Sequence, residues 1–473
     1  MKYLKYIIAI ILTVILSMIL VISCKSIYGF DEEENYNGGG GSGGGGTITN
    51  KDGKVFASWY LTEEQQREPY SQGPTIVFDS MGAPNTQIYH IPAIIVADNG
   101  NIIAFGDNRY EKSVDIGFGQ GLIDIVYKIS KDGGKTWSAE KIIEPKSTSE
   151  DVTRIDNKGD VSVFKCLSGK LVALAVSGGG FKNGANLKSP SRMLMSKSFD
   201  NGETWSLWEE VGKISVFNKM RSKGISRGFA TSGRGTTLKS GHLATCMVGD
   251  ENGKGWVAYY LYSDDEGETW NIYDNMQVAK GDWGLSEPKI LGELDNGDLI
   301  MTVRNASGSD KNRTATQPRM YGYSKDGGAH WGTFDNPTSG KLGYWNNSMK
   351  CGNVDSEGIV WTRASEHDIT RILHLLTGPN FRQGMAFWLS TDDGRTFKNV
   401  RNVINVSAFP TKYNAGYNSL DVCGDGTIVT LSEEYNTSNT TLGTADYDLV
   451  FRRYNMRAIT GEVYKTEWYK EIK

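Results

Sequence analysis

Arginine and carboxylate residues stand close together in several short segments of the chain, and these residue types could bind an anion and move protons. Phe105-Gly-Asp-Asn-Arg109 is followed six residues later by Asp115. Ser286-Glu287-Pro288 is followed, after a turn-like stretch, by Arg304-Asn305. An arginine fork binds a carboxylate through two N–H groups, while Asp and Glu serve as general acids and bases. Each residue alone is also typical of a surface ion pair or a turn, so the segments need a fold that brings them together.

Five near-copies of one turn pattern indicate that fold. The copies are Ser130-Lys-Asp-Gly-Gly-Lys-Thr-Trp137, Ser198-Phe-Asp-Asn-Gly-Glu-Thr-Trp205, Ser263-Asp-Asp-Glu-Gly-Glu-Thr-Trp270, Ser324-Lys-Asp-Gly-Gly-Ala-His-Trp331 and Ser390-Thr-Asp-Asp-Gly-Arg-Thr-Phe397. Their first serines lie 68, 65, 61 and 66 residues apart, and such a period indicates a repeated supersecondary unit. Each copy follows a strand-like run and ends in an aromatic residue, which is typical of a β-propeller blade.

The repeated pattern is expected to be structural rather than catalytic. Its Asp accepts hydrogen bonds from backbone N–H groups, and its Gly supplies the positive φ of a tight turn. Its Ser and Thr hydroxyls bond across the turn, and its aromatic residue fills the space between strands. One Asp per turn without a second carboxylate at EF-hand spacing argues against calcium. We therefore expect one all-β propeller domain over residues 47–473.

Composition excludes several classes of partner. The net charge of −4 offers no basic surface for nucleic acid or for an anionic membrane, and 57 glycines suit a turn-rich β protein. The cysteines outside the N-terminal segment show no metal-binding spacing, so we expect no zinc site, and we expect no other metal or cofactor. We expect them to be buried free thiols, with disulfides of an exported protein as the alternative; they are Cys166, Cys246, Cys351 and Cys423.

The N-terminus reads as a targeting segment. Two lysines precede an apolar run that ends at Ser23-Cys24, so residues 1–24 resemble a bacterial lipoprotein signal with Cys24 as the lipidated residue. An uncleaved membrane anchor is the alternative interpretation. Residues 25–46 are acidic and then Gly-rich, which predicts a flexible tether. Both interpretations place the remaining chain outside the cytoplasm, at the bacterial cell envelope or surface.

The turn repeats and the segments between them resemble the sialidases, exo-acting hydrolases of terminal sialic acids whose repeated turns are called Asp boxes. The segments that carry the resemblance are, in chain order, Gln87-Ile-Tyr-His-Ile-Pro-Ala93, Phe105 to Asp115, Ser286-Glu-Pro288 with Leu294-Asp-Asn-Gly297 and Arg304-Asn305, Gly378-Pro-Asn-Phe-Arg382, Tyr417-Asn-Ser-Leu420, Leu431-Ser-Glu433 and Phe451-Arg-Arg-Tyr454. Their order and spacing agree from about Phe78 to the end of the domain. The resemblance implies a six-bladed β-propeller in which the N- and C-terminal segments share the blade without an Asp box.

The resemblance also implies site residues. Sialic acid carries a carboxylate on its anomeric carbon, and Arg304 and Arg382 match two arginines of the family's carboxylate clamp. That charge would repel a carboxylate nucleophile, and sialidases use a tyrosine instead. Tyr417 matches this nucleophile, and Glu287 matches the residue that takes its proton.

Three more residues match the family's pocket. Asp115 corresponds to the acid/base that protonates the leaving oxygen and then activates water, a role that requires a pKa raised towards neutrality. Arg109 is expected to contact the ring substituents or the carboxylate of the sugar. Asp160, in Gly159-Asp-Val-Ser-Val163, resembles a further pocket contact.

His90 departs from the family pattern, because it stands where the first arginine of the clamp is expected. Histidine is shorter than arginine, is mostly neutral above a pKa of about 6.5 and cannot form the two-pronged contact. Losing one charge-assisted contact costs on the order of 2–4 kcal/mol, or roughly 30- to 1000-fold in rate. Glu433 matches the residue that braces this position, and would face His90. A weaker sialidase, an acid-shifted one and a protein that binds sialosides without cutting them all remain open.

The sequence thus predicts a retaining exo-α-sialidase that acts on sialylated glycans or glycoproteins. A sialic-acid-binding adhesin on the same fold is the alternative, with catalysis lost through His90. A propeller used only for protein interaction would leave Arg304, Arg382 and the Ser286-Glu-Pro288 segment unexplained.

Overall fold

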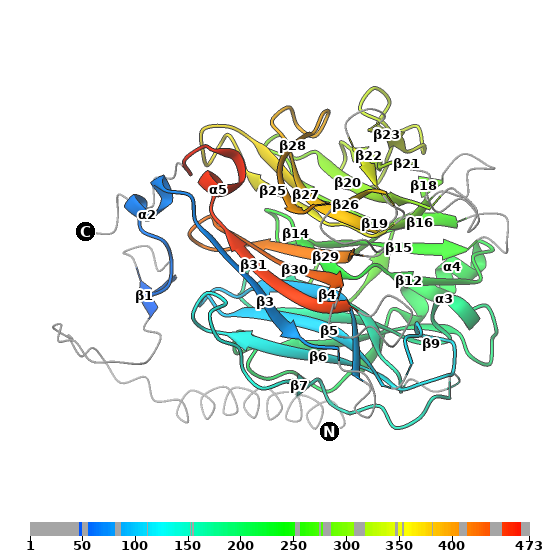
Figure 1. The fold of residues 1–473 in the computed structure, drawn as a ribbon. Helices are drawn as coiled ribbons and strands as arrows, with labels where there is room; N and C mark the ends of the chain where they lie inside the picture. Colours follow the sequence, from blue (N-terminus) through cyan, green and yellow to red (C-terminus); the bar gives the residue numbers. More distant parts are fainter. Residues whose placement is uncertain are drawn as a thin grey trace, which may run out of the picture. The chain divides into compact units, whose positions relative to one another are not determined.

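Antiparallel β-strands dominate the computed structural model of the protein (Figure 1), which confirms the all-β prediction. The structure describes residues 47–49, 55–80, 87–110, 112–151, 153, 156–250, 256–273, 276–277, 285–306, 317–345, 349–351, 354–380, 382–405, 414–435 and 447–464. Residues 45–473 form one compact unit. The expected signal segment 1–24 with Cys24, the tether 25–46 and the side chain of Cys351 lie outside the described part.

The strands pair mainly with their chain neighbours in groups of four. In pairing order, the first group is β4 (Gln87–Val96), β5 (Ile102–Tyr110), β6 (Ile123–Ser130) and β7 (Lys141–Ile142), and the second is β8 (Gly159–Lys165), β9 (Leu171–Gly178), β10 (Ser191–Ser198) and β11 (Glu209–Val211). The third group is β12 (Arg227–Ala230), β15 (Leu243–Asp250), β16 (Trp256–Ser263) and β17 (Asn271–Ile272), and the fourth is β19 (Leu285–Glu293), β20 (Leu299–Asn305), β22 (Met320–Ser324) and β23 (Gly343–Tyr344). The fifth group is β25 (Gly358–Thr362), β26 (Arg371–Asn380), β27 (Gln383–Ser390) and β28 (Lys398–Ile404), and the last is β29 (Ala415–Val422), β30 (Ile428–Tyr435), β31 (Tyr447–Tyr454) and β3 (Ser71–Phe78).

Short elements complete the described chain. The remaining strands are β1 (Thr47–Thr49) paired with β2 (Val55–Ala57), β13 (Gly233–Arg234) beside β8, β14 (Thr236–Thr237) beside β15, β18 (Met276–Gln277) beside β16, and β21 (Gln317–Pro318) paired with β24 (Lys350–Cys351). The helices are α2 (Glu63–Arg67), α3 (Gly180–Asn183), the π-helix η1 (Lys213–Asn218), α4 (Lys219–Ser222) and α5 (Met456–Thr460).

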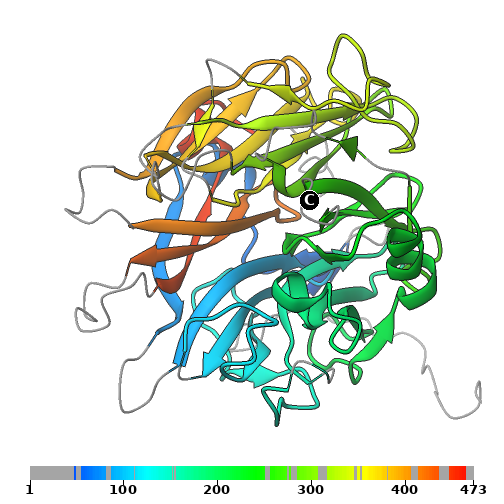
Figure 2. The same ribbon diagram turned by 90° about the vertical axis from the view of Figure 1, so that its right-hand side faces the viewer.

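Each strand group contacts the next one along the chain, and the last group contacts the first. β4 contacts β8, β9 contacts β12, β15 contacts β19, β19 contacts β25, β25 contacts β29, and β29 contacts β4. Figure 2 shows the sheets following one another in chain order around a common centre, with the last strands beside the first. One residue pair, Tyr447 with Tyr89, also joins β31 to β4 in a ladder. The first strand of each group therefore faces the centre, where side chains from distant segments meet.

The repeated turns take the expected form. Each connects the third strand of a group to the fourth, and in the third copy Thr269 N and Gly267 N donate to Asp265 Oδ1 and Ser263 Oγ, both at 2.8 Å. The closing aromatic packs against the preceding group, as Trp270 does against Phe164 of β8 at 5.3 Å between ring centroids. The last group has no such turn because its fourth strand, β3, comes from the N-terminal side of the chain.

Buried apolar clusters lie between neighbouring groups. One cluster joins Leu174 and Met193 of the second group to Met247 and Leu261 of the third. Among the described cysteines, Cys166, Cys246 and Cys423 are buried free thiols, as expected. No helix of the described residues has the length and apolar character that a membrane span requires.

Candidate active site

Irregular backbone occurs at three of the inner strands, β4, β8 and β19, and at the connection between β26 and β27. Four residues there other than glycine adopt a positive φ, namely Ile91 at 54°, Asp160 at 54°, Glu287 at 34° and Arg382 at 49°. The ladder register shifts between His90 and Ala93, between Gly159 and Ser162, between Ser286 and Pro288, and between Ala415 and Asn418. A bulge of this kind turns the strand locally and re-aims its side chains. Here the re-aimed side chains point into one cavity.

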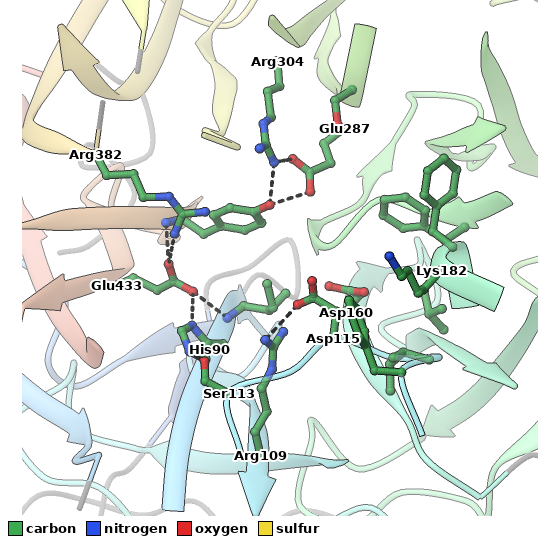
Figure 3. Close-up of a pocket in the computed structure, with 18 of the residues that line it drawn as sticks. His90, Arg109, Ser113, Asp115, Asp160, Lys182, Glu287, Arg304, Arg382 and Glu433 are labelled. Atoms are coloured by element: carbon green, nitrogen blue, oxygen red, sulfur yellow. Dashed lines mark hydrogen bonds and ion pairs between the residues drawn. The ribbon is translucent and has the colours of Figure 1, made fainter. Parts of the chain in front are cut away.

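This cavity has a volume of about 580 Å³, and all nine residues predicted from the sequence line it (Figure 3). Those residues are His90, Arg109, Asp115, Asp160, Glu287, Arg304, Arg382, Tyr417 and Glu433. The structure therefore brings together residues from five of the strand groups. Sequence reasoning missed ten more lining residues, which are Ile91, Ser113, Ile116, Phe118, Val176, Phe181, Lys182, Phe229, Trp256 and Ser286.

Tyr417, Glu287 and Arg304 form one hydrogen-bonded set. Tyr417 Oη donates to Glu287 Oε1 at 2.5 Å and accepts from Arg304 Nη1 at 2.7 Å, and the same Nη1 bonds Glu287 Oε2. Burial, opposed by Arg304 and reinforced by Glu287, raises the pKa of the Tyr417 phenol well above its ordinary value. The phenol is therefore neutral, and a carboxylate stands ready to take its proton.

A second set is centred on the buried carboxylate of Glu433. Its Oε1 accepts from the backbone N–H of Ile91 at 3.0 Å and lies 3.1 Å from His90 Nδ1, while its Oε2 accepts from Tyr417 N at 2.9 Å. Arg382 Nη1 lies 3.8 Å from the same Oε2. Although burial opposes it, the His90 hydrogen bond and charge lower the pKa of Glu433 to about 2. Glu433 therefore braces the position of His90, as the resemblance implies.

Arg109 lies among three aspartates. Its Nη1 is 2.8 Å from Asp115 Oδ1 and its Nη2 is 3.3 Å from Asp107 Oδ2, and the backbone N–H of Asp160 donates to Asp107 at 3.0 Å. Burial, opposed by Arg109, raises the pKa of Asp107 to about 7. Burial and the neighbouring carboxylates of Asp107 and Asp115 raise the pKa of Asp160. The Arg109 guanidinium thus lies among carboxyl groups whose raised pKa values, at Asp107 and Asp160, favour a bound proton.

The expectation of a raised pKa for Asp115 is wrong for the ligand-free protein. Its side chain is 69% exposed, at the mouth of the cavity. Partial burial would raise its pKa, but the charge and hydrogen bond of Arg109, with the charge of His90, lower it. The sequence showed the spacing of Arg109 and Asp115, but not that the two side chains pair.

The remaining wall of the cavity is apolar and carries one lysine. Phe181 contacts both Phe229 and Trp256, with ring centroids 5.5 and 5.1 Å apart. Figure 3 shows the Lys182 amine directed into the cavity, and its Nζ lies 5.2 Å from the Phe118 ring centroid. Phe181 and Lys182 come from helix α3, and Phe229 and Trp256 come from strands of the third group. The sequence signal near α3 was the run of glycines at 178–180. Among the described residues no group of His, Cys, Asp and Glu side chains is arranged to hold a metal ion.

Comparison with known proteins agrees with this geometry. The family description "BNR repeat-like domain" matches residues 119–429, which is more than half of the chain. A sialidase of Paraclostridium sordellii is 28% identical over 273 residues, which are 56% of this chain and 62% of the relative. The chain thus spans about three-fifths of the length of this curated relative.

Solved structures share the fold. The Hadza microbial sialidase Hz136 superposes with a TM-score of 0.59 at 19% identity, over 79% of this chain and 66% of the other. Trypanosoma rangeli sialidase in complex with 2,3-difluorosialic acid, described as a covalent intermediate, superposes with a TM-score of 0.55 at 19% identity, over 86% and 56%. At this identity the likeness establishes the all-β fold.

Proposed function

This chain belongs to the bacterial sialidase family with BNR repeat-like domains, and we propose that it hydrolyses terminal sialic acids from glycoconjugates. The observation that carries the proposal is the contact of Tyr417 Oη with Glu287 at 2.5 Å and with Arg304 at 2.7 Å. A phenol held between a base and a guanidinium is an activated neutral nucleophile, suited to an anomeric carbon that bears a carboxylate. A protein that only binds sugars has no need of this arrangement.

In the proposed mechanism, Arg304 and Arg382 bind the substrate carboxylate beside the Tyr417 ring. Their Cζ atoms lie 5.9 and 5.4 Å from its centroid. Tyr417 Oη attacks the anomeric carbon while Glu287 takes the phenolic proton. Asp115 protonates the leaving oxygen, and then takes a proton from the water that releases the sugar with retention. The bound carboxylate competes for the nearby cations, which weakens their hold on Asp115 and raises its pKa towards the value that an acid requires.

The fold supports further proposals of the same kind. Six groups of four strands with cyclic contacts favour six blades, with β3 completing the blade that lacks an Asp box. Residues 47–473 are proposed as the single propeller domain. Lipidation at Cys24 and a position at the cell envelope or surface are proposed from the N-terminal sequence alone.

A sialoside-binding protein without turnover is the second candidate. His90 favours it, because the imidazole contacts Glu433 and Ser113 and supplies no guanidinium fork to the clamp. The complete set of Tyr417, Glu287 and Asp115 favours the enzyme.

Hydrolysis of an aryl α-sialoside between about pH 4 and 8 tests the proposal, since this range brackets the ordinary histidine pKa. Turnover by the protein and its loss in Tyr417→Phe support a sialidase. Turnover that climbs as the pH falls indicates that a positive charge gained in acid assists the clamp. Binding of sialyllactose without turnover would instead establish the second candidate.

A further inference from the structure

Ser113, His90 and Glu433 form a continuous hydrogen-bonded chain in the cavity. His90 Nε2 lies 2.8 Å from Ser113 Oγ, and His90 Nδ1 lies 3.1 Å from Glu433 Oε1 (Figure 3). Glu433 is held in turn by the backbone N–H groups of Ile91 and Tyr417. A hydroxyl, an imidazole and an anchored carboxylate at these distances are the parts of an activated serine nucleophile.

The chemistry of Glu433 determines the orientation of the protons. Glu433 accepts the backbone N–H groups of Ile91 and Tyr417, one on each oxygen, which favours its ionised form, and a carboxylate can only accept hydrogen bonds. His90 Nδ1 must therefore carry the proton of this contact. In the neutral imidazole Nε2 is then an acceptor, and the Ser113 hydroxyl donates to it. This is the tautomer that a general base for Ser113 requires.

The two ends of this hydrogen-bonded set differ in their exposure to the cavity, as a catalytic site requires. His90 and Glu433 are buried, whereas Ser113 is exposed and lines the cavity. Arg109 and Arg382 line the same cavity. Their positive charge would stabilise the oxyanion that forms when a hydroxyl adds to an ester carbonyl.

We propose that Ser113, His90 and Glu433 form a second catalytic site that hydrolyses O-acyl esters, with Ser113 as the nucleophile. Ser113 Oγ forms a bond to the carbonyl carbon as its proton passes to His90 Nε2. The bond from that carbon to the alcohol oxygen breaks, and the alcohol leaves with the proton from Nε2. Water then adds to the acyl-serine and gives a proton to Nε2, which returns it to Ser113 Oγ as the free acid leaves.

The cavity indicates which ester this site would take. An O-acyl group on an acidic sugar suits it, because the arginines attract the acid and the wall of Phe181, Phe229 and Trp256 accepts the acyl chain. This substrate assignment rests on the proposed sialidase function, whereas the ester hydrolysis does not. His90 thus acts as a general base at the position where the resemblance implies an arginine of the carboxylate clamp.

The test uses the full chain, a fluorophosphonate probe and 4-nitrophenyl acetate. We expect stoichiometric labelling on the peptide that carries Ser113, and Ser113→Ala to lower ester turnover by about 100-fold or more. His90→Arg should remove the labelling while it raises sialoside cleavage, since arginine cannot act as the base. Ser240→Ala, which removes an exposed hydroxyl outside the cavity, is the matched control.

Labelling confined to other residues, or undiminished ester turnover in a folded Ser113→Ala variant, would overturn the serine site. The labelling result on the unaltered protein does not depend on whether a variant folds. Ester cleavage without sialoside cleavage would refute the sialidase proposal alone. Sialoside cleavage without Ser113 labelling would refute the second site alone.

Discussion

The Asp-box turns and the central cavity both force residues other than glycine into a positive φ, but they support this conformation differently. In the turns such residues directly precede the box glycine, as Asn201, Glu266 and Asp393 do with φ of 54–57°. The stabilising bonds span four residues, from Ser or Asp to the backbone of the same turn. In the cavity the corresponding bond of Ile91 reaches Glu433, 342 residues away.

The turns are thus stabilised by local hydrogen bonds, whereas the geometry of the cavity forms only when the strand groups pack together. A turn can reach its conformation as soon as its own residues are present, because its donors and acceptors are neighbours in the chain. The strained backbone at the cavity is supported only after the strand groups have packed around the centre. Substitutions should therefore divide into those that change activity and those that change stability.

The largest effect is expected from Tyr417→Phe. Loss of the nucleophile should lower sialoside turnover on the order of 10³-fold or more and abolish covalent trapping by a fluorinated sialic acid. The melting temperature should stay close to that of the unaltered protein, because the contacts of Oη among the described residues are the side chains of Glu287 and Arg304. Tyr273→Phe, outside the cavity lining, is the control. Continued labelling of the Tyr417 variant would exclude this residue as nucleophile.

Asp107→Asn should change the pH dependence of stability. Burial, opposed by Arg109, raises the pKa of Asp107 to about 7, so its protonated form is favoured in the folded state. The stability from this group is complete below the unfolded pKa of about 4 and is lost as pH rises through about 7, on the order of a few kcal/mol. Denaturant unfolding from about pH 4 to 8 should show a shallower decline in the variant. Identical slopes would contradict the shifted pKa.

His90→Arg should raise aryl sialoside hydrolysis at neutral pH by roughly 30-fold, which corresponds to about 2 kcal/mol in the transition state. The added guanidinium would face Glu433 and complete the carboxylate clamp. Steady-state kinetics at neutral pH measures the change. An unchanged or lower rate would show that His90 does not limit the clamp.

The smallest effect is expected in a turn. Asp265→Ala removes the acceptor for Thr269 N and for the Thr269 hydroxyl, and should lower the free energy of unfolding by about 1–2 kcal/mol without changing turnover. The adjacent Asp264 is exposed and pairs with the mostly buried His242, so Asp264→Ala should cost less, about 0.5 kcal/mol. A loss of turnover in Asp265→Ala at unchanged stability would contradict the assignment of the turns to stability and of the cavity to activity.

Much of the site could be predicted from the sequence because its polar residues stand in short segments with recognisable neighbours. Tyr417, Glu287 and the arginines were each found in this way, and all line the cavity. Ser113, Phe181 and Lys182 were missed, since nothing in their immediate sequence shows that their side chains face the cavity. The pKa expected for Asp115 was wrong because its side chain pairs with that of Arg109, a contact that the spacing of the two residues does not show by itself.

The amino-acid sequence alone was enough to establish the repeat, the turns and the all-β class, because these depend on bonds and periodicities within a few tens of residues. The bulges at the centre and the contact of His90 with Ser113 depended on tertiary packing. A histidine beside Glu433 and Ser113 has a different chemistry from a histidine in an isolated strand, and that difference arises from burial and neighbouring charge. Burial and neighbouring charge exist only once the chain has closed on itself.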